Sequence, residues 1–155
     1  MNIQIVKGDL LSQSVDVIVN AWNRNVIPWW LLLPQGVSGA IKRKAGIKPF
    51  LELPWKPMPL GSAVITSAGR LQYKYIIHVA GINLFWSASE KSIQDSVINA
   101  MALASAKKMT SIAFPIIGAG SGRFKKDEAL AIMTKTFDHL DYDIQVTIVD
   151  FSKSY

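Results

Sequence analysis

The stretch SIAFPIIGAGSGRFKKDEALAIMTKTFDHL, residues 111–140, contains the unit that decides the fold. A short apolar run, Ser111–Phe114, has the length and composition of a buried strand and leads into a loop with glycine at every second position from Gly118 to Gly122. Apolar residues then follow helical spacing from about Lys125 to Leu140, and a further strand-like run follows at Gln145–Val149. A strand, a glycine loop, a helix and another strand in succession indicate an α/β fold.

The same alternation extends over the rest of the chain. Strand-like runs rich in β-branched residues lie at Ile3–Val6, Val15–Val19, Ala63–Thr66 and Tyr75–Val79. Helical patterns cover Val37–Lys44, which ends before Gly46, and the region of Ile93, Val97 and Met101. The first two strands are too close in sequence for a helical crossover. We therefore expect a single domain, residues 1–155, with a three-layer α/β/α architecture around a mixed central sheet.

The composition narrows the chemistry that the chain can perform. Of 155 residues 50% are hydrophobic and none is cysteine, which fits a globular protein and excludes a disulfide framework and a thiol nucleophile. The two histidines are His78 and His139, so we expect no metal and no cofactor. The start of the sequence lacks the features of a signal peptide, and the apolar run at 26–34 is far shorter than the ~20 residues of a membrane-spanning helix. We expect a cytoplasmic protein that does not span a membrane.

The charge balance favours anionic partners. The formal net charge is +6, and the basic residues are spread along the chain, with short clusters at Lys42–Lys44 and Arg123–Lys126. A phosphate-bearing small ligand and weak attraction to nucleic acid fit this distribution about equally well.

The glycine loop has the chemistry of an anion site. Successive glycines let backbone N–H groups converge on an anion, and the N-terminus of the following helix adds partial positive charge, so a diphosphate is a natural ligand. The spacing G-x-G-x-G matches neither the dinucleotide fingerprint nor the P-loop. By itself the loop fits a structural turn as well as a ligand cradle, and Phe124 fits either a core aromatic or a platform for a base or ribose.

Five segments in the same order as in a known family give a more specific indication. They are VKGDLL (Val6–Leu11), VDVIVNAWN (Val15–Asn23), GVSGAIKRKAG (Gly36–Gly46), GSAVITSAGRLQYKYIIHVAG (Gly61–Gly81) and FPIIGAGSGRF (Phe114–Phe124). Together they resemble the macrodomain family, whose members bind ADP-ribose, over nearly the whole chain. The resemblance implies a macrodomain-like α/β/α fold and a ligand site on these segments.

The resemblance also assigns roles to residues. Asp9 would accept a hydrogen bond from adenine N6, although an aspartate here also suits a turn or a helix cap. Asn23 would contact the ribose nearest the reactive end and support hydrolysis, which makes it the candidate catalytic residue, whereas Asn20 more readily fixes the loop backbone. Phe151 falls near the family's adenine-stacking aromatic and equally fits an ordinary aromatic near a chain end. The full expected ligand set is Asp9, Leu10, Ala21, Asn23, Gly36, Val37, Ser38, Ile117, Gly118, Ala119, Gly120, Ser121, Gly122, Arg123, Phe124 and Phe151.

The sequence departs from the family in the catalytic loop. Active members of one branch carry an aspartate in GVDGAI, and this chain has Ser38 there, which cannot serve as a carboxylate base. The preceding glycine-rich segment is replaced by RNVIPWWLLLPQG, so that Trp29–Leu33 can pack on the core, cover the ligand or dock a protein partner. Asp127 and Glu128 suit the first turn of a helix better than the role of a substitute base. His78, inside an apolar strand, fits a core histidine better than a base.

Two functions fit these features about equally. One is a hydrolase that removes ADP-ribose from a macromolecule or cleaves a related ester such as O-acetyl-ADP-ribose. Asn23 and the phosphate loop would hold the distal ribose, and the ligand's own diphosphate would help to position the water. The other is a reader that binds ADP-ribose without turnover, in keeping with Ser38. A domain that binds RNA or poly(ADP-ribose) through its positive charge is a weaker third interpretation.

Overall fold

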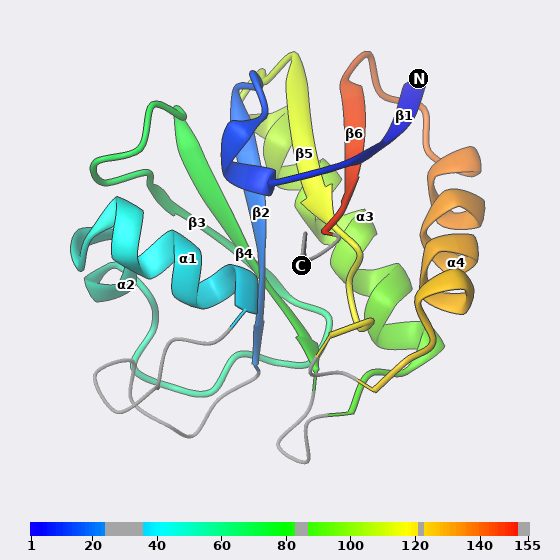
Figure 1. Ribbon diagram of the computed structural model, residues 1–155, viewed down its shortest axis with the longest axis horizontal. Coiled ribbons are helices and arrows are strands. Elements are labelled where there is room, and N and C mark those ends of the chain that lie inside the picture. The colour runs from blue at the N-terminus through cyan, green and yellow to red at the C-terminus, as the bar shows by residue number, and fades with distance from the viewer. Residues whose placement is uncertain (24–35, 83–86, 121–122, 152–155) are drawn as a thin grey trace.

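The fold is built on one six-stranded sheet. In the computed structural model, which describes residues 1–23, 36–82, 87–120 and 123–151, the strands lie in the order β1-β6-β5-β2-β4-β3 (Figure 1). Their bounds are β1 Asn2–Lys7, β2 Val17–Asn23, β3 Ala63–Ser67, β4 Tyr75–Ile82, β5 Ser111–Pro115 and β6 Gln145–Asp150. Neighbouring strands are parallel except β3, which pairs with β4 in antiparallel orientation. The expected mixed sheet is confirmed.

Helical elements cover both faces of this sheet. The short 3₁₀ helix η1 (Leu10–Ser12), α1 (Gly36–Ala45) and α2 (Lys48–Leu51) pack on one face, and α3 (Glu90–Ala106) and α4 (Lys126–Asp138) pack on the other (Figure 1). The three-layer α/β/α architecture expected from the sequence is therefore confirmed.

Alternating side chains divide the interior into two cores. On β2, Val17 and Val19 face the core shared with α3 and α4, whereas Ile18 faces the core shared with η1, α1 and α2. All three side chains are fully buried. The reason is the period of two in a strand, which sends successive side chains to opposite faces of a sheet that is covered on both sides.

A chain of polar side chains crosses the buried middle of the sheet. The Asn20 Nδ2 lies 3.1 Å from His78 Nδ1, and the His78 Nε2 lies 2.9 Å from Thr66 Oγ1. These residues sit on the adjacent strands β2, β4 and β3 and are almost completely buried. Burial lowers the pKa of His78 from its ordinary 6.5 to about 3, so the imidazole is neutral. His78 is thus a hydrogen-bonded core histidine, as its place in an apolar strand predicted.

The end of α1 is held against the turn between β3 and β4. The Arg70 N–H donates to the Ala45 carbonyl at 2.9 Å, and Gly69 has a φ of +59°. A Cβ at Gly69 would lie 2.2 Å from the same carbonyl oxygen. Only glycine fits this close approach, which fixes α1 relative to the sheet.

Gly69→Ala should therefore destabilise the protein strongly, by about 2–4 kcal/mol, because it combines a left-handed backbone with a clash against backbone. Chemical denaturation followed by tryptophan fluorescence measures the effect. Gly120→Ala is the matched control, since in the described part of the chain no heavy atom lies within 4 Å of a Cβ there. Equal unfolding midpoints for the two variants would contradict this account of Gly69.

The stability of the fold should fall as the pH is lowered below His78's ordinary pKa. Between about pH 6.5 and pH 3 the unfolded chain takes up a proton at this histidine and the folded chain does not, so the unfolding free energy drops with a slope approaching about 1.4 kcal/mol per pH unit. Denaturation curves between pH 7 and pH 5 measure this slope above the range where carboxylates titrate. His78→Gln should flatten this slope.

Candidate functional site

The candidate site lies where two neighbouring strands part. Within the sheet β2 pairs with β4 from Val17 to Asn23, but it pairs with β5 at Val17 and Ile18 alone. The connection after β2 leads through α1 and α2 to β3 on one side, and the connection after β5 leads through α4 to β6 on the other. Open α/β sheets bind ligands outside the carboxyl ends of strands at such a topological switch point.

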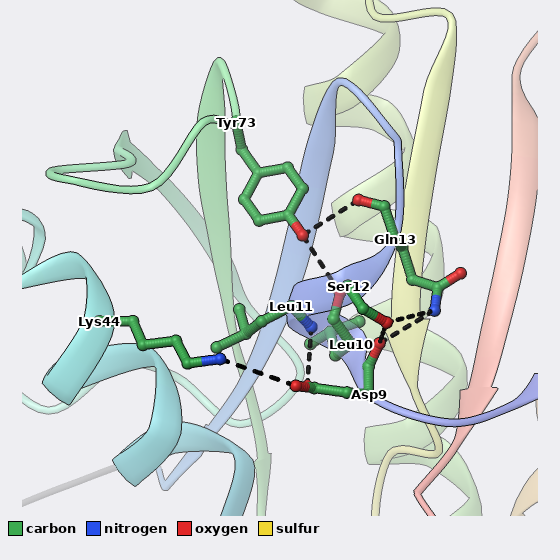
Figure 2. A network of polar contacts seen from close by, with 7 residues as sticks. All are labelled: Asp9, Leu10, Leu11, Ser12, Gln13, Lys44 and Tyr73. Atoms are coloured by element: carbon green, nitrogen blue, oxygen red, sulfur yellow. Dashed lines mark hydrogen bonds and ion pairs between the residues drawn. The ribbon is translucent and has the colours of Figure 1, made fainter.

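Asp9 follows β1 at this edge of the sheet and has two differently placed carboxylate oxygens (Figure 2). The Oδ1 accepts a hydrogen bond from the Leu11 N–H at 2.9 Å and so caps η1. The Oδ2 lies 3.8 Å from the Lys44 Nζ, and the side chain remains 48% exposed. One oxygen therefore serves the fold, and the other is available to a ligand that displaces an exposed and weak ion pair.

The backbone around Asp9 is fixed by its neighbours. The Tyr73 hydroxyl lies within hydrogen-bonding distance of the Leu10 and Gln13 carbonyls, at 3.3 Å and 3.1 Å, and the Gln13 Nε2 donates to the Asp9 carbonyl at 2.9 Å (Figure 2). Burial, and to a lesser degree the charge of Asp9, raise the pKa of Tyr73, which keeps the hydroxyl a donor. The Leu10 side chain is buried in the core, so this residue faces the site through its backbone.

The glycine loop after β5 contains two described glycines with different surroundings. A Cβ at Gly118, whose φ is +89°, would lie 2.9 Å from the Ala88 Cβ and 3.1 Å from the Ile93 Cδ1. This glycine is thus required by packing against α3. A Cβ at Gly120 would meet no atom of the described residues within 4 Å, and this residue is exposed. Gly120 therefore belongs to the open side of the loop.

The loop also closes on itself. The Phe124 N–H donates to the Gly118 carbonyl at 3.0 Å, and the Arg123 N–H donates to the Gly120 carbonyl at 3.3 Å. Arg123 has a φ of +59° and is exposed, whereas Phe124 is half-buried against the core. Ala119 is half-buried, and Ile117 is fully buried with its N–H directed to the Met133 Sδ at 3.4 Å. Gly120 and Arg123 are thus the exposed members of the expected set here, and Ser121 and Gly122 lie outside the described residues.

The first turn of α1 is attached to the carboxyl end of β2. The Ser38 hydroxyl donates to the Asn20 Oδ1 at 2.7 Å and lies 3.3 Å from the Ala21 carbonyl. Gly36 begins the helix with a φ of +56°, and Val37 packs against the core below it. Gly36, Val37, Ser38 and Ala21 therefore lie together at the carboxyl end of β2. The Asn23 backbone is part of β2, but its side chain, like residues Trp29–Leu33, lies outside the described part of the chain.

Phe151 is placed beside the loop that carries Asp9. It directly follows β6 and is 54% exposed, and the Gly8 N–H donates to the carbonyl of the preceding residue, Asp150, at 3.0 Å. The Asp150 carboxylate in turn pairs with the Lys126 Nζ at 3.0 Å. Asp9 and Phe151 thus come from opposite ends of the sequence to one corner of the site.

Several residues of the site were not anticipated from the sequence. Lys44, Tyr73 and Asp150 each contact another segment that is far away in the sequence, and no local pattern marks them.

Asp127 and Glu128 lie exposed in the first turn of α4, where carboxylates suit the helix N-terminus.

Neither a metal centre nor a membrane helix is found in the described ranges. Within them, no three or more histidine, aspartate or glutamate side chains are grouped so as to hold a metal ion. No helix there is long and apolar enough to cross a membrane.

Comparison with known proteins identifies relatives over nearly the whole chain. The family model of the Macro domain matches residues 19–133. A Macro domain-containing protein of Listeria monocytogenes is 39% identical over 97% of this chain and 89% of its own length. The O-acetyl-ADP-ribose deacetylase of Escherichia coli is 36% identical over 86% of this chain and 77% of its own length.

Solved structures similar to this fold belong to the same family as the relatives found by sequence. The Oceanobacillus iheyensis macrodomain with ADP superposes with a TM-score of 0.82 at 33% identity, covering 96% of this chain and 83% of that one. The resemblance inferred from the five sequence segments is therefore confirmed. From the match of the family model and the identity to these relatives, the chain belongs to the Macro domain family.

Proposed function

We propose that the protein binds ADP-ribose and hydrolyses an ADP-ribosyl linkage or ester on an acceptor. The observation that carries the proposal is the common location of the half-exposed Asp9 side chain and the open glycine loop at Gly120, at one edge of the sheet. A relative is named an O-acetyl-ADP-ribose deacetylase, and solved macrodomains of similar sequence contain ADP or ADP-ribose.

Binding would divide the ligand among three parts of the site. The adenine amine donates to the Asp9 Oδ2 in place of Lys44, with Phe151 beside the base. The diphosphate lies on the glycine loop, where Gly120 leaves room for close approach of the backbone and Arg123 adds positive charge. The distal ribose then reaches the carboxyl end of β2, near Ser38 and Asn23.

Hydrolysis at this end would proceed without a side-chain base at position 38. A water molecule attacks the anomeric carbon, the bond to the acceptor breaks, and the proton of the water passes to the leaving acceptor. Because Ser38 cannot act as a carboxylate base, the rate would come from orientation by Asn23 and from the ligand's own diphosphate. An ester-bearing ligand would instead be attacked at its acyl carbon.

A reader without turnover is the second candidate, and the hydroxyl at Ser38 is the observation that favours it. Calorimetric titration with ADP-ribose, followed by incubation with O-acetyl-ADP-ribose and with a mono-ADP-ribosylated protein, separates the two. We expect binding together with release of product. Binding of ADP-ribose without release of product would support the reader function. Absence of binding would contradict both functions.

The variant Gly120→Glu, in the same calorimetric titration, tests whether the diphosphate of the ligand lies on the glycine loop. A carboxylate in the open part of the glycine loop should abolish binding of ADP-ribose while leaving the unfolding midpoint unchanged, because no atom of the described residues lies within 4 Å of a Cβ at this position. Gly120→Ala is the matched variant without the charge. Unchanged affinity in Gly120→Glu would contradict the placement of the diphosphate.

Asp9→Asn should change which base the site prefers. Asparagine caps η1 as well as aspartate does, and its oxygen is held by the Leu11 N–H, so its amide NH₂ replaces the outer carboxylate oxygen. Affinity for ADP-ribose should fall about tenfold or more, because two donors then face each other. The hypoxanthine analogue of ADP-ribose, which presents an acceptor at that position, should bind relatively better.

Calorimetric titration of the wild type and of Asp9→Asn, each with ADP-ribose and with its hypoxanthine analogue, measures this preference for the base. Lys44→Met is the control, since it removes the ion pair and leaves the Asp9 carboxylate in place. Retention of the adenine preference in Asp9→Asn would show that Asp9 only caps η1.

A further inference from the structure

We propose that Ser38 contacts the distal end of the ligand as a hydrogen-bond acceptor and not as a donor, because the buried chain Asn20–His78–Thr66 holds its proton on the inner side. The proposal rests on the proposed function, since it concerns the ribose end of the same site. It assigns a positioning role to three residues that lie beneath the site.

The immediate surroundings of Ser38 leave its proton with two inner acceptors. Its hydroxyl has one proton and two lone pairs. The Asn20 Oδ1 lies 2.7 Å away and the Ala21 carbonyl 3.3 Å away, and both accept from it. With its proton held by these acceptors, the Ser38 oxygen can offer a ligand only lone pairs.

The direction of the hydrogen bonds that link Thr66, His78, Asn20 and Ser38 can be followed from Thr66, the end that lies farthest from the site. With the Thr66 hydroxyl donating to the Ser67 carbonyl at 3.0 Å, its oxygen accepts from the His78 Nε2, 2.9 Å away. A neutral imidazole carries one proton, so His78 Nδ1 then accepts from the Asn20 Nδ2 at 3.1 Å. The asparagine amide is thereby oriented with its oxygen toward Ser38.

With the hydrogen bonds in the reversed direction, the Ser38 proton would be held less firmly on the inner side. Thr66 would then donate to His78 Nε2, His78 Nδ1–H to the Asn20 oxygen, and the Asn20 amide to Ser38. The Ser38 proton would pass to the Ala21 carbonyl, which is farther away at 3.3 Å. The distance of 2.7 Å between the Ser38 and Asn20 oxygens is typical of an O–H···O hydrogen bond, and it favours the first direction, in which the proton is held inward.

An aspartate at position 38 would require the reversed direction. A carboxylate can only accept, so Asn20 would have to turn its amide NH₂ outward, and His78 would have to carry its proton on Nδ1. Ser38 therefore keeps an acceptor at this position, but a neutral one. Such an oxygen aligns a ribose hydroxyl or a water molecule without taking its proton.

Two measurements test the proposal. Histidine labelled with ¹⁵N, with His78 assigned by comparison with His139→Gln, reports the imidazole tautomer by NMR. We expect the Nε2–H form in the wild type and in Ser38→Ala, and the Nδ1–H form in Ser38→Asp. In parallel, Ser38→Ala should weaken binding of ADP-ribose about five- to tenfold, the loss of one hydrogen bond, and leave binding of ADP unchanged.

The outcomes separate this proposal from the proposed function. Equal effects of Ser38→Ala on ADP and ADP-ribose, or no effect on either, would overturn the contact between Ser38 and the distal ribose. An unchanged His78 tautomer in folded Ser38→Asp, or an Nδ1–H form in the wild type, would overturn the proposed order of donors and acceptors along Thr66, His78, Asn20 and Ser38. If the wild type binds neither ligand, the proposed function fails and the contact fails with it, while the NMR still decides the direction.

Discussion

The position of β2 between β4 and β5 is the constraint on which the rest of the structure depends. Its residues Val17, Ile18 and Val19 are fully buried because both faces of the sheet are covered, and they contribute to both cores. Pairing with β4 continues to Asn23, whereas pairing with β5 ends after Ile18. The same strand therefore holds the two halves of the sheet together and separates them at the edge where a ligand is expected.

The residues at this edge serve the fold and the candidate site together. Asp9 caps η1 through one oxygen, Gly118 packs against α3, and Ser38 ties α1 to β2. The physical reason is that loops at strand ends must satisfy their own backbone groups before they can offer anything to a ligand. What remains for a ligand is the second Asp9 oxygen, the open backbone at Gly120 and the lone pairs of Ser38. Structural and functional interpretations of these residues were presented as alternatives on the sequence, and for Asp9 the geometry accommodates both.

Much of the fold could be predicted from the sequence, and the errors have identifiable causes. All six strands were found, because short β-branched runs between turn residues give a clear signal. The strand expected from Val15 begins at Val17 because the Asp16 carboxylate accepts from the Thr110 N–H at 2.8 Å and pairs with Lys74 at 2.7 Å. The elements η1 and α2 were not anticipated, since three and four residues are too few to show helical periodicity. Their positions depend on Leu10 and Phe50, which enter the core beneath α1.

By itself the sequence determined the layer architecture, the core position of His78 and the family, because each follows from local pattern or from motifs kept in order. Only the tertiary structure decided that Gly118 is needed for packing while Gly120 is open, that Lys44 faces Asp9, and that Asn20, His78 and Thr66 form one chain ending at Ser38. These relations join residues on different strands and helices. Their distances are set by strand register and helix packing, which no local stretch of sequence encodes.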